Sequence, residues 1–223
     1  MSLLKINNLS FEAADKKILE NIQFTLEEGD FLSITGPSGS GKSTLLKIIA
    51  TILSKTSGEV LYKGKPVESY EPTEYRKEVS YCFQSPVLFG DTVKDNLAFP
   101  YDIRQMAFDE GKAVEYLKMV GLSEDYLNKS ITSLSGGEKQ RIALIRNILF
   151  QPKILLLDEV TSALDEENRQ IIWKWLHEMR QKTEMTILMI SHNEEEAALA
   201  SKHIRIVAGK MANKGGVVNE SAN

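Results

Sequence analysis

A glycine-rich segment near the N-terminus has the residue types and spacing that bind phosphate. It lies between two apolar stretches, Phe31–Thr35 and Leu45–Ile49, in the order strand, loop, helix. Glycines let the backbone curl until successive amide hydrogens point at a phosphate, and the helix start adds partial positive charge. An ordinary glycine turn is the alternative, and the flanking elements count against it. The pattern predicts a nucleoside triphosphate site formed by Gly36, Pro37, Ser38, Gly39, Ser40, Gly41, Lys42, Ser43 and Thr44.

Two side chains of this loop carry the chemistry beyond backbone amides. Lys42 supplies a full positive charge to the β- and γ-phosphates, and the Ser43 hydroxyl is a ligand for Mg2+. The sequence therefore predicts ATP and Mg2+ as the bound molecules.

A pair of carboxylates, Asp158 and Glu159, follows the wholly apolar run Ile154–Leu157. Such a run is typical of a parallel strand buried on both faces, and ligands of open α/β sheets bind where the strands end. We expect Asp158 to hold Mg2+ and Glu159 to orient and polarise the attacking water. Two solvated acids at a strand end are the alternative, which the preceding phosphate loop makes the weaker one.

A second anion site is predicted at the start of a helix that continues through Ile142–Phe150. Ser135 and Glu138 have the spacing of a capping box, which satisfies free amides at a helix start. The two residues between them, Gly136 and Gly137, each cost a helix roughly 1 kcal/mol relative to alanine. That cost favours a functional interpretation, in which the glycines let a γ-phosphate approach the amides.

These segments, in this order, resemble the ATPase subunits of ABC transporters over nearly the whole chain. Gly36–Thr44 is similar to the family's Walker A motif, Ile154–Glu159 to Walker B, and Ser135–Glu138 to the signature sequence. The resemblance also implies roles for residues that carry no signal by themselves. These are Gln84 as the Q-loop glutamine and a metal ligand, His192 as the switch histidine near the γ-phosphate, and Ser162, Ala163, Leu164 and Asp165 as the D-loop.

The resemblance further implies where the adenine base lies. Phe11 is similar to the aromatic residue that stacks on adenine, and Ile18 joins the nucleotide-binding set. A core role for Phe11 is the alternative, but stacking needs only a ring face.

The elements that must position these residues form an α/β fold of the P-loop ABC type. Short apolar stretches predict a β-rich N-terminal part, the middle has helical spacing, and Ile171–Met179 forms one stripe of a crossover helix before the strand Ile187–Ile190. We expect one domain over 1–212. Its β-rich and parallel-sheet core comprises 1–84 and 151–212, its helical subdomain comprises 85–150, and 213–223 is a flexible tail.

Composition bounds the partners. The 223 residues are 42% hydrophobic, enough for a real core, and 27 basic against 31 acidic residues leave a net charge of −4. No global positive field exists to attract nucleic acid, so phosphate binding is local. The single cysteine, Cys82, excludes an internal disulfide framework, and no signal sequence or long apolar run is evident. We expect a position on the cytoplasmic face of the membrane, attached through another chain.

The family resemblance implies a homodimer in which the signature of one copy closes on the ATP held by the other, working with a membrane permease. The expected function is ATP hydrolysis that energises solute export, without direct contact between this chain and the solute. The alternatives are an ABC ATPase that signals across a membrane complex and a soluble ABC protein of DNA repair or translation. The latter class usually carries large insertions or two ATPase domains, and neither fits 223 residues.

The connector that follows Gln84 is unusually apolar over Ser85–Pro100. We interpret Leu88, Phe89, Phe99 and Tyr101 as part of a groove for a short permease helix, with local packing as the alternative. This stretch and Leu144–Asn147 are similar to the ATP-binding subunits of bacterial iron-export ABC transporters.

Overall fold

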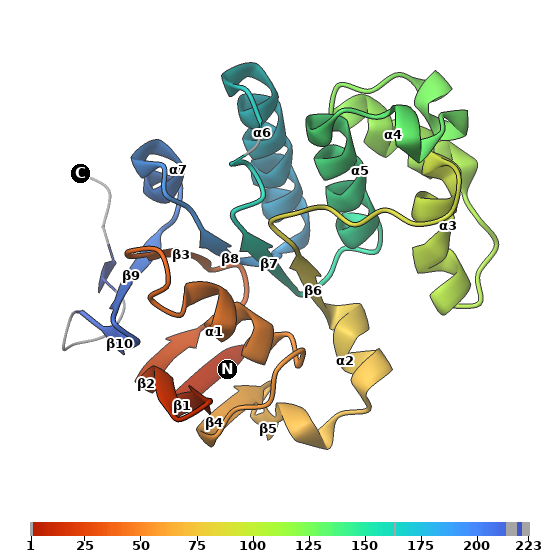
Figure 1. The fold of residues 1–223 in the computed structure, drawn as a ribbon. Coiled ribbons are helices and arrows are strands. Elements are labelled where there is room, and N and C mark those ends of the chain that lie inside the picture. Colours follow the sequence, from red (N-terminus) through yellow and green to blue (C-terminus); the bar gives the residue numbers. More distant parts are fainter. Residues whose placement is uncertain (1, 163, 213–217, 220–223) are drawn as a thin grey trace. The chain divides into compact units, whose positions relative to one another are not determined.

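The computed structural model describes residues 2–162, 164–212 and 218–219 (Figure 1). The chain divides into two compact units. The core unit comprises residues 1–81, 153–159 and 184–223, and the helical unit comprises residues 82–152 and 160–183. The sequence predicts 160–183 as part of the core, whereas this segment belongs to the helical unit.

The core unit is built from two sheets. The four-stranded sheet has the order β2-β1-β4-β5, and the seven-stranded sheet has the order β10-β9-β3-β8-β7-β6, with β11 paired to β9. The strands are β1 (Leu4–Ala13), β2 (Lys16–Leu26), β3 (Phe31–Thr35), β4 (Ser57–Tyr62), β5 (Lys65–Pro66), β6 (Val79–Cys82), β7 (Ile154–Asp158), β8 (Thr186–Ile190), β9 (Lys202–Val207), β10 (Lys210–Met211) and β11 (Val218–Asn219).

The centre of the larger sheet is parallel, since β3 pairs with β8 and β9, and β8 pairs with β7, all in the same direction. Every residue of β7 and of β8 is buried, as the unbroken apolar runs predict. Parallel alignment brings the carboxyl ends of β3, β7 and β8 to one edge of the sheet. The phosphate loop, the two carboxylates and His192 each follow one of these three strands.

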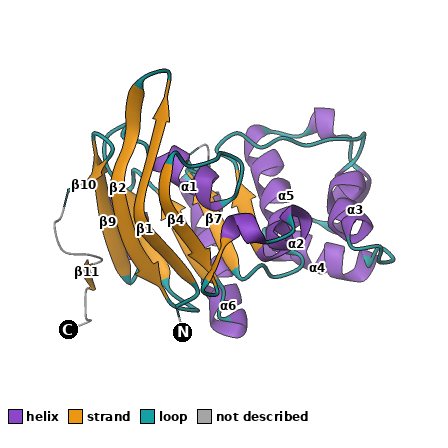
Figure 2. Cartoon of the chain, turned by 90° about the horizontal axis from the view of Figure 1, so that it is seen from below, coloured by secondary structure: helices purple, strands orange, loops and turns teal. Residues whose placement is uncertain are grey.

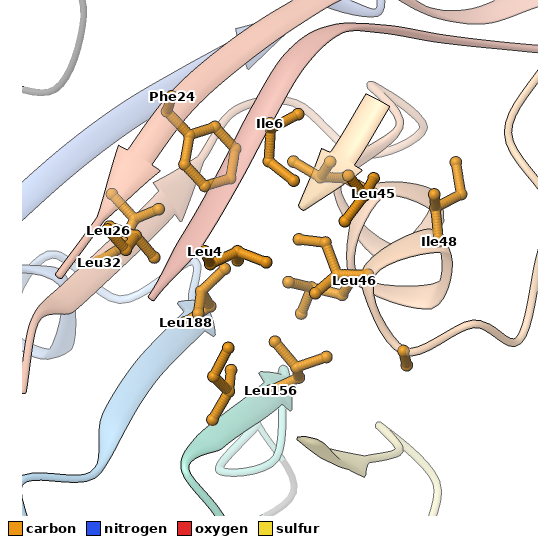
Figure 3. Packing of buried hydrophobic residues seen from close by; sticks show 14 of the residues in the cluster. Leu4, Ile6, Phe24, Leu26, Leu32, Leu45, Leu46, Ile48, Leu156 and Leu188 are labelled. Atoms are coloured by element: carbon orange, nitrogen blue, oxygen red, sulfur yellow. The ribbon is translucent and has the colours of Figure 1, made fainter. Parts of the chain in front are cut away.

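One helix fills the space beside these strands. The core unit contains α1 (Lys42–Ile49), α2 (Pro72–Glu78), α7 (Glu194–Ala198) and the 3-10 turn Val67–Ser69. Leu45 and Leu46 of α1 are fully buried among Leu4 of β1, Leu156 of β7 and Leu188 of β8 (Figure 3). This packing anchors α1, which begins where the phosphate loop ends. The loop therefore has a rigid support on its C-terminal side.

The helical unit contains α3 (Val93–Ile103), α4 (Glu110–Met119), α5 (Gly136–Ile148) and α6 (Glu166–Thr183), drawn in purple in Figure 2. Short 3-10 turns lie at Glu124–Asn128 and Ile131–Ser133. The apolar stripe predicted on α6 is buried at Ile172, Trp175 and Met179, and the Trp175 ring meets Tyr116 of α4 edge to face at 5.8 Å.

The predicted fold class is confirmed by these elements. Of the tail expected over 213–223, only Val218–Asn219 is described, and these two residues pair with β9; the remainder lies outside the described residues. Among the residues that the structure describes, no helix is long and apolar enough to span a bilayer.

Candidate active site

The phosphate loop connects β3 to α1 in a conformation that requires glycine. Gly36 has φ 137° and Gly41 has φ 100°. A Cβ on Gly36 would lie 1.9 Å from the Ile206 carbonyl oxygen, and one on Gly41 would lie 2.8 Å from that of Ile18. Any side chain at these positions would displace backbone, so the loop keeps its curl only with glycine. Between them Pro37, Ser38 and Gly39 are exposed, so the crest of the loop is open to a ligand.

The loop contains buried polar groups that suit a phosphate. Lys42 is 4% exposed, and its Nζ donates to the carbonyl oxygens of Gly36 at 2.9 Å and Pro37 at 3.0 Å. Burial lowers the pKa of Lys42, while Glu159 and Asp158 act in the opposite direction. The Ser40 hydroxyl is buried and has no hydrogen-bond partner among the described residues. An anion in the loop would compensate both groups.

Two of the three residues expected to hold Mg2+, Ser43 and Asp158, lie together in the core unit, whereas Gln84 belongs to the helical unit. Ser43 Oγ donates to Asp158 Oδ1 at 2.8 Å, and Asp158 is 4% exposed. The described residues contain no group of three or more His, Cys, Asp or Glu side chains arranged around a metal. Mg2+ is usually bound by one or two protein oxygens together with substrate phosphates and water, so this hydroxyl and carboxylate fit it. When bound, the ion would neutralise charge on the phosphates.

The predicted base and the predicted switch residue are in direct contact. Glu159 Oε1 lies 2.8 Å from His192 Nε2, and Glu159 N donates to the Ile190 carbonyl oxygen at 3.2 Å. Glu159 has φ 51°, a region that residues other than glycine rarely adopt. Asn193 caps the helix α7 that follows, accepting from the amides of Glu195 and Glu196. The Glu159 carboxylate is thus held by the imidazole of His192, which follows the adjacent strand β8.

The two residues expected near adenine lie on neighbouring strands. Phe11 of β1 is half-buried against the core and is paired in register with Leu19 of β2. Ile18 precedes Leu19, and both approach Gly41 at the end of the phosphate loop. The β1–β2 hairpin therefore adjoins the loop. Thr44, the last residue assigned to the nucleotide, lies in the first turn of α1 and is half-buried.

The signature segment begins α5 in the helical unit. Ser135 Oγ accepts from Glu138 N at 3.2 Å, and Glu138 Oε2 accepts from Ser135 N at 2.7 Å, which is the predicted capping box. Tyr126 donates to the other oxygen of Glu138, and this bond is the main cause of that carboxylate's lowered pKa. The described contacts include no acceptor for the amides of Gly136 and Gly137. A Cβ on Gly136 would meet nothing within 4 Å. The space over this helix start is open to an anion.

The D-loop contacts this helix start within the same unit. A Cβ on Gly137 would lie 3.2 Å from Cδ2 of Leu164. Asp165 accepts from the amide of Asn168 at 2.9 Å, which caps α6. Ser162 and Gln84 are exposed, and Ala163 lies outside the described residues.

One polar residue of the site carries no motif in the sequence. Tyr81 of β6 donates to Asp158 Oδ2 at 2.5 Å. The available signal is a phenol inside a short buried strand, because a buried hydroxyl normally has a partner. The sequence alone does not show which partner. Its neighbour Cys82 is buried, and burial raises the pKa of the thiol to about 12, so it is unreactive.

The apolar connector is partly as predicted. Phe89 and Phe99 are 37% and 41% exposed, their rings meet at 4.7 Å, and Leu88 is half-buried. The prediction that Tyr101 lies on this surface is wrong. Tyr101 is 3% exposed, and its ring lies edge to face with those of Phe108 and Phe150, because α3 turns it toward the interior of the helical unit.

Two polar side chains hold the connector in place. Asn96 Nδ2 donates to the carbonyl oxygens of Phe89 at 2.8 Å and Thr92 at 3.0 Å, and its Oδ1 accepts from Phe89 N. Arg146 of α5 donates to that same Oδ1 and to the Val87 carbonyl oxygen, each at 3.0 Å. The hydrogen bonds of Asn96 and Arg146 therefore fix the backbone of the connector, from which the exposed rings project.

Comparison with known proteins shows the family to which the chain belongs. The family model described as ABC transporter matches residues 19–162. The chain is 48% identical over 211 residues to the "Probable iron export ATP-binding protein FetA" of Escherichia coli strain K12, covering 94% of each chain. It is 37% identical to the "Spermidine/putrescine import ATP-binding protein PotA" of Mycoplasma mycoides subsp. mycoides SC over 92% of this chain but 59% of that relative.

Two solved structures of ABC proteins are similar to this chain over almost its whole length. The dimeric post-hydrolysis ATP-binding cassette MJ0796 with ADP and Pi is 27% identical, covers 99% of this chain and 100% of its own, and has a TM-score of 0.87. A bacterial Atm1-family ABC exporter with ATP bound is 27% identical with a TM-score of 0.86. That comparison covers 94% of this chain and 38% of the exporter chain.

Proposed function

Because this chain belongs to the ABC transporter family and is an ATP-binding and ATP-hydrolysing subunit of it, we propose that it energises solute export through a separate membrane permease. The similarity to FetA over 94% of both chains carries this proposal. Since FetA is described as an iron export protein, the solute class is a metal ion, with iron the first candidate. The subunit itself acts at the cytoplasmic face of the membrane, where ATP is available.

The contacts of Lys42, Ser43 and Glu159 support the roles that we propose for the site residues. The curled loop 36–44 and Lys42 hold the triphosphate, while Ser43 and Asp158 hold Mg2+ with Gln84 as a further ligand. Glu159 polarises water, and His192 holds that carboxylate in line. Phe11 and Ile18 contact the base. The phosphate loop, the two carboxylates and His192 are grouped at one end of β3, β7 and β8, which supports their roles. Phe11, Ile18 and Gln84 are assigned from the resemblance to the family's motifs.

The other half of each site comes from a second copy. Ser135, Gly136, Gly137 and Glu138 close on the γ-phosphate held by the partner, and the D-loop of Ser162, Ala163, Leu164 and Asp165 accompanies them. The open space over Gly136 supports this role. Dimeric MJ0796 is a precedent among the structural relatives. ATP then holds two copies together, and hydrolysis releases them.

The permease contacts the surface formed by Val87, Phe89 and Phe99, which we call the connector surface. Its members are 66%, 37% and 41% exposed, a concentration of apolar area that marks a partner site. A short amphipathic helix of the permease fits such a surface.

Transport is tested by reconstitution with the permease. The multi-span membrane protein that copurifies with the chain is first identified, and the two are then coexpressed. ATP-dependent uptake of radioactive Fe2+ is measured in inside-out vesicles that contain both. We expect uptake that is absent with Glu159→Gln. Tight membrane association with ATP hydrolysis but without flux of any metal would contradict export and favour a signalling complex.

A further inference from the structure

The carboxylate of Asp158 is held at both of its oxygens. Oδ1 accepts from Ser43 Oγ at 2.8 Å, and Oδ2 accepts from the Tyr81 hydroxyl at 2.5 Å. All three residues belong to the core unit, and Asp158 and Tyr81 are 4% and 7% exposed. The two donors come from different elements, α1 and β6.

Holding both oxygens matters because the terminal torsion of an aspartate is soft. Rotation about the bond to the carboxylate has broad, roughly two-fold preferences, so one hydrogen bond leaves the plane of the group free to turn. A second donor from another element fixes the plane. The ring of the donor on β6 is buried in the hydrophobic cluster of the core unit, so packing restrains it.

We propose that Tyr81 is a positioning residue for the magnesium site, which it serves by fixing the orientation of the Asp158 carboxylate. The phenol holds Oδ2, so Oδ1 and the Ser43 hydroxyl stay directed toward the place where nucleotide phosphates bring the ion. Outer-shell hydrogen bonds of this kind orient carboxylate ligands and typically change metal affinity by about 10- to 100-fold. The inference rests on the proposed role of Asp158.

A purely structural role for Tyr81 is the competing explanation, and the chain offers a matched control for it. Tyr75 is also a buried tyrosine of the core unit, 1% exposed, and its hydroxyl donates to the Ile49 carbonyl oxygen at 2.7 Å. Tyr75→Phe and Tyr81→Phe each remove one buried, hydrogen-bonded phenol oxygen and retain the ring. Only Tyr81→Phe removes a bond to Asp158.

The experiment measures binding of the fluorescent, non-hydrolysable nucleotide mant-AMPPNP to the full chain, first in EDTA and then across a Mg2+ titration. For Tyr81→Phe we expect unchanged affinity in EDTA and a half-saturating Mg2+ concentration raised about tenfold. For Tyr75→Phe we expect the same half-saturating Mg2+ concentration as for the unmodified protein. Asp158→Asn is included to test the metal assignment itself.

Each other outcome overturns the inference in a distinguishable way. If Tyr81→Phe titrates like the unmodified protein while Asp158→Asn loses its response to Mg2+, Tyr81 has no positioning role and the proposed site stands. If Asp158→Asn also responds normally, the metal assignment is wrong and the inference falls with it. If Tyr81→Phe loses nucleotide binding in EDTA as well, or fails to fold, Tyr81 is structural.

Discussion

Glu159 and His192, the proposed base and switch residue, are brought together by two strand ends. The carboxylate follows β7 and the imidazole follows β8, and their contact at 2.8 Å exists because these strands are parallel neighbours. The Glu159 side chain is 17% exposed, against 51% for His192. The backbone of Glu159 has a positive φ, which costs a non-glycine residue about 1–3 kcal/mol and is found at functional sites. A carboxylate held in this way suits a base that must keep one orientation toward water.

Replacing the base should separate binding from hydrolysis. In Glu159→Gln the shape is kept and the negative charge is lost, so phosphate release should fall by about 10²- to 10⁴-fold while ATP affinity is unchanged. ATP-bound dimers should accumulate and be visible by size-exclusion chromatography. The control is Glu167→Gln, an exposed residue in the first turn of α6. Normal hydrolysis by Glu159→Gln would refute the assignment.

At the scale of elements, the start of α5 is capped and yet left open. Its capping box uses the side chains of Ser135 and Glu138, whereas a Cβ on Gly136 would meet nothing within 4 Å. Gly136 has no positive φ, so its backbone does not require glycine. The absence of a side chain fits the proposal that a γ-phosphate comes close at this position.

Gly136→Ala should therefore stabilise the subunit but weaken its function. The alanine reduces the entropy of the unfolded chain, so the free energy of unfolding should stay equal or rise by about 0.4–1 kcal/mol. ATP-dependent dimerisation should weaken, because the added methyl occupies the path of the γ-phosphate. Gly111→Ala is the control, since Gly111 is also helical and its added Cβ meets only Asp109 Oδ1 at 3.4 Å. Unchanged dimerisation of Gly136→Ala would contradict the anion site.

The connector surface is likewise a property of elements, because α3 and α5 brace it through Asn96 and Arg146. Phe89→Glu places a charge on its exposed ring position and should abolish permease-coupled transport while leaving the ATPase activity of the isolated chain unchanged. The control is Ile52→Glu, which alters an apolar residue of comparable exposure, 43%, after α1. Unchanged transport by Phe89→Glu would eliminate this surface as the permease contact.

For the whole molecule, the decisive feature is that the two segments proposed to bind the triphosphate belong to different units of the chain. The phosphate loop belongs to the core unit and the signature to the helical unit. With a net charge of −4, the protein has no general attraction for polyphosphate, so affinity depends on these local sites. If a second copy completes each site, as we propose, ATP hydrolysis depends on association.

A mixture of two inactive variants tests this dependence. Lys42→Ala lacks the phosphate loop's charge and Ser135→Arg lacks a working signature, so each homodimer is inactive. After subunit exchange, random pairing should restore about a quarter of the sites, because each mixed dimer has one intact pair of surfaces. Phosphate release by the mixture is compared with that of each variant alone. Mixed dimers that copurify through two different tags but release no phosphate would contradict a shared site.

The sequence by itself determined the features that depend on neighbours along the chain. The strand, glycine loop and helix at 31–49, the buried runs of β7 and β8, and the capping box at Ser135 are all recognisable, because each signal lies within about ten residues. The resemblance to the family's motifs adds His192 and Gln84 to the residues that the sequence identifies. The ATPase chemistry is thus evident from the order of residues alone.

Only the tertiary structure decided which distant residues meet. The order of strands sets β6 close enough to β7 for Tyr81 to reach Asp158, and the packing of α3 buries Tyr101 rather than exposing it. Segment 160–183 likewise joins the helical unit, although it follows a core strand. Such contacts depend on long-range packing of apolar faces, and neither periodicity nor local spacing encodes which face a side chain will find.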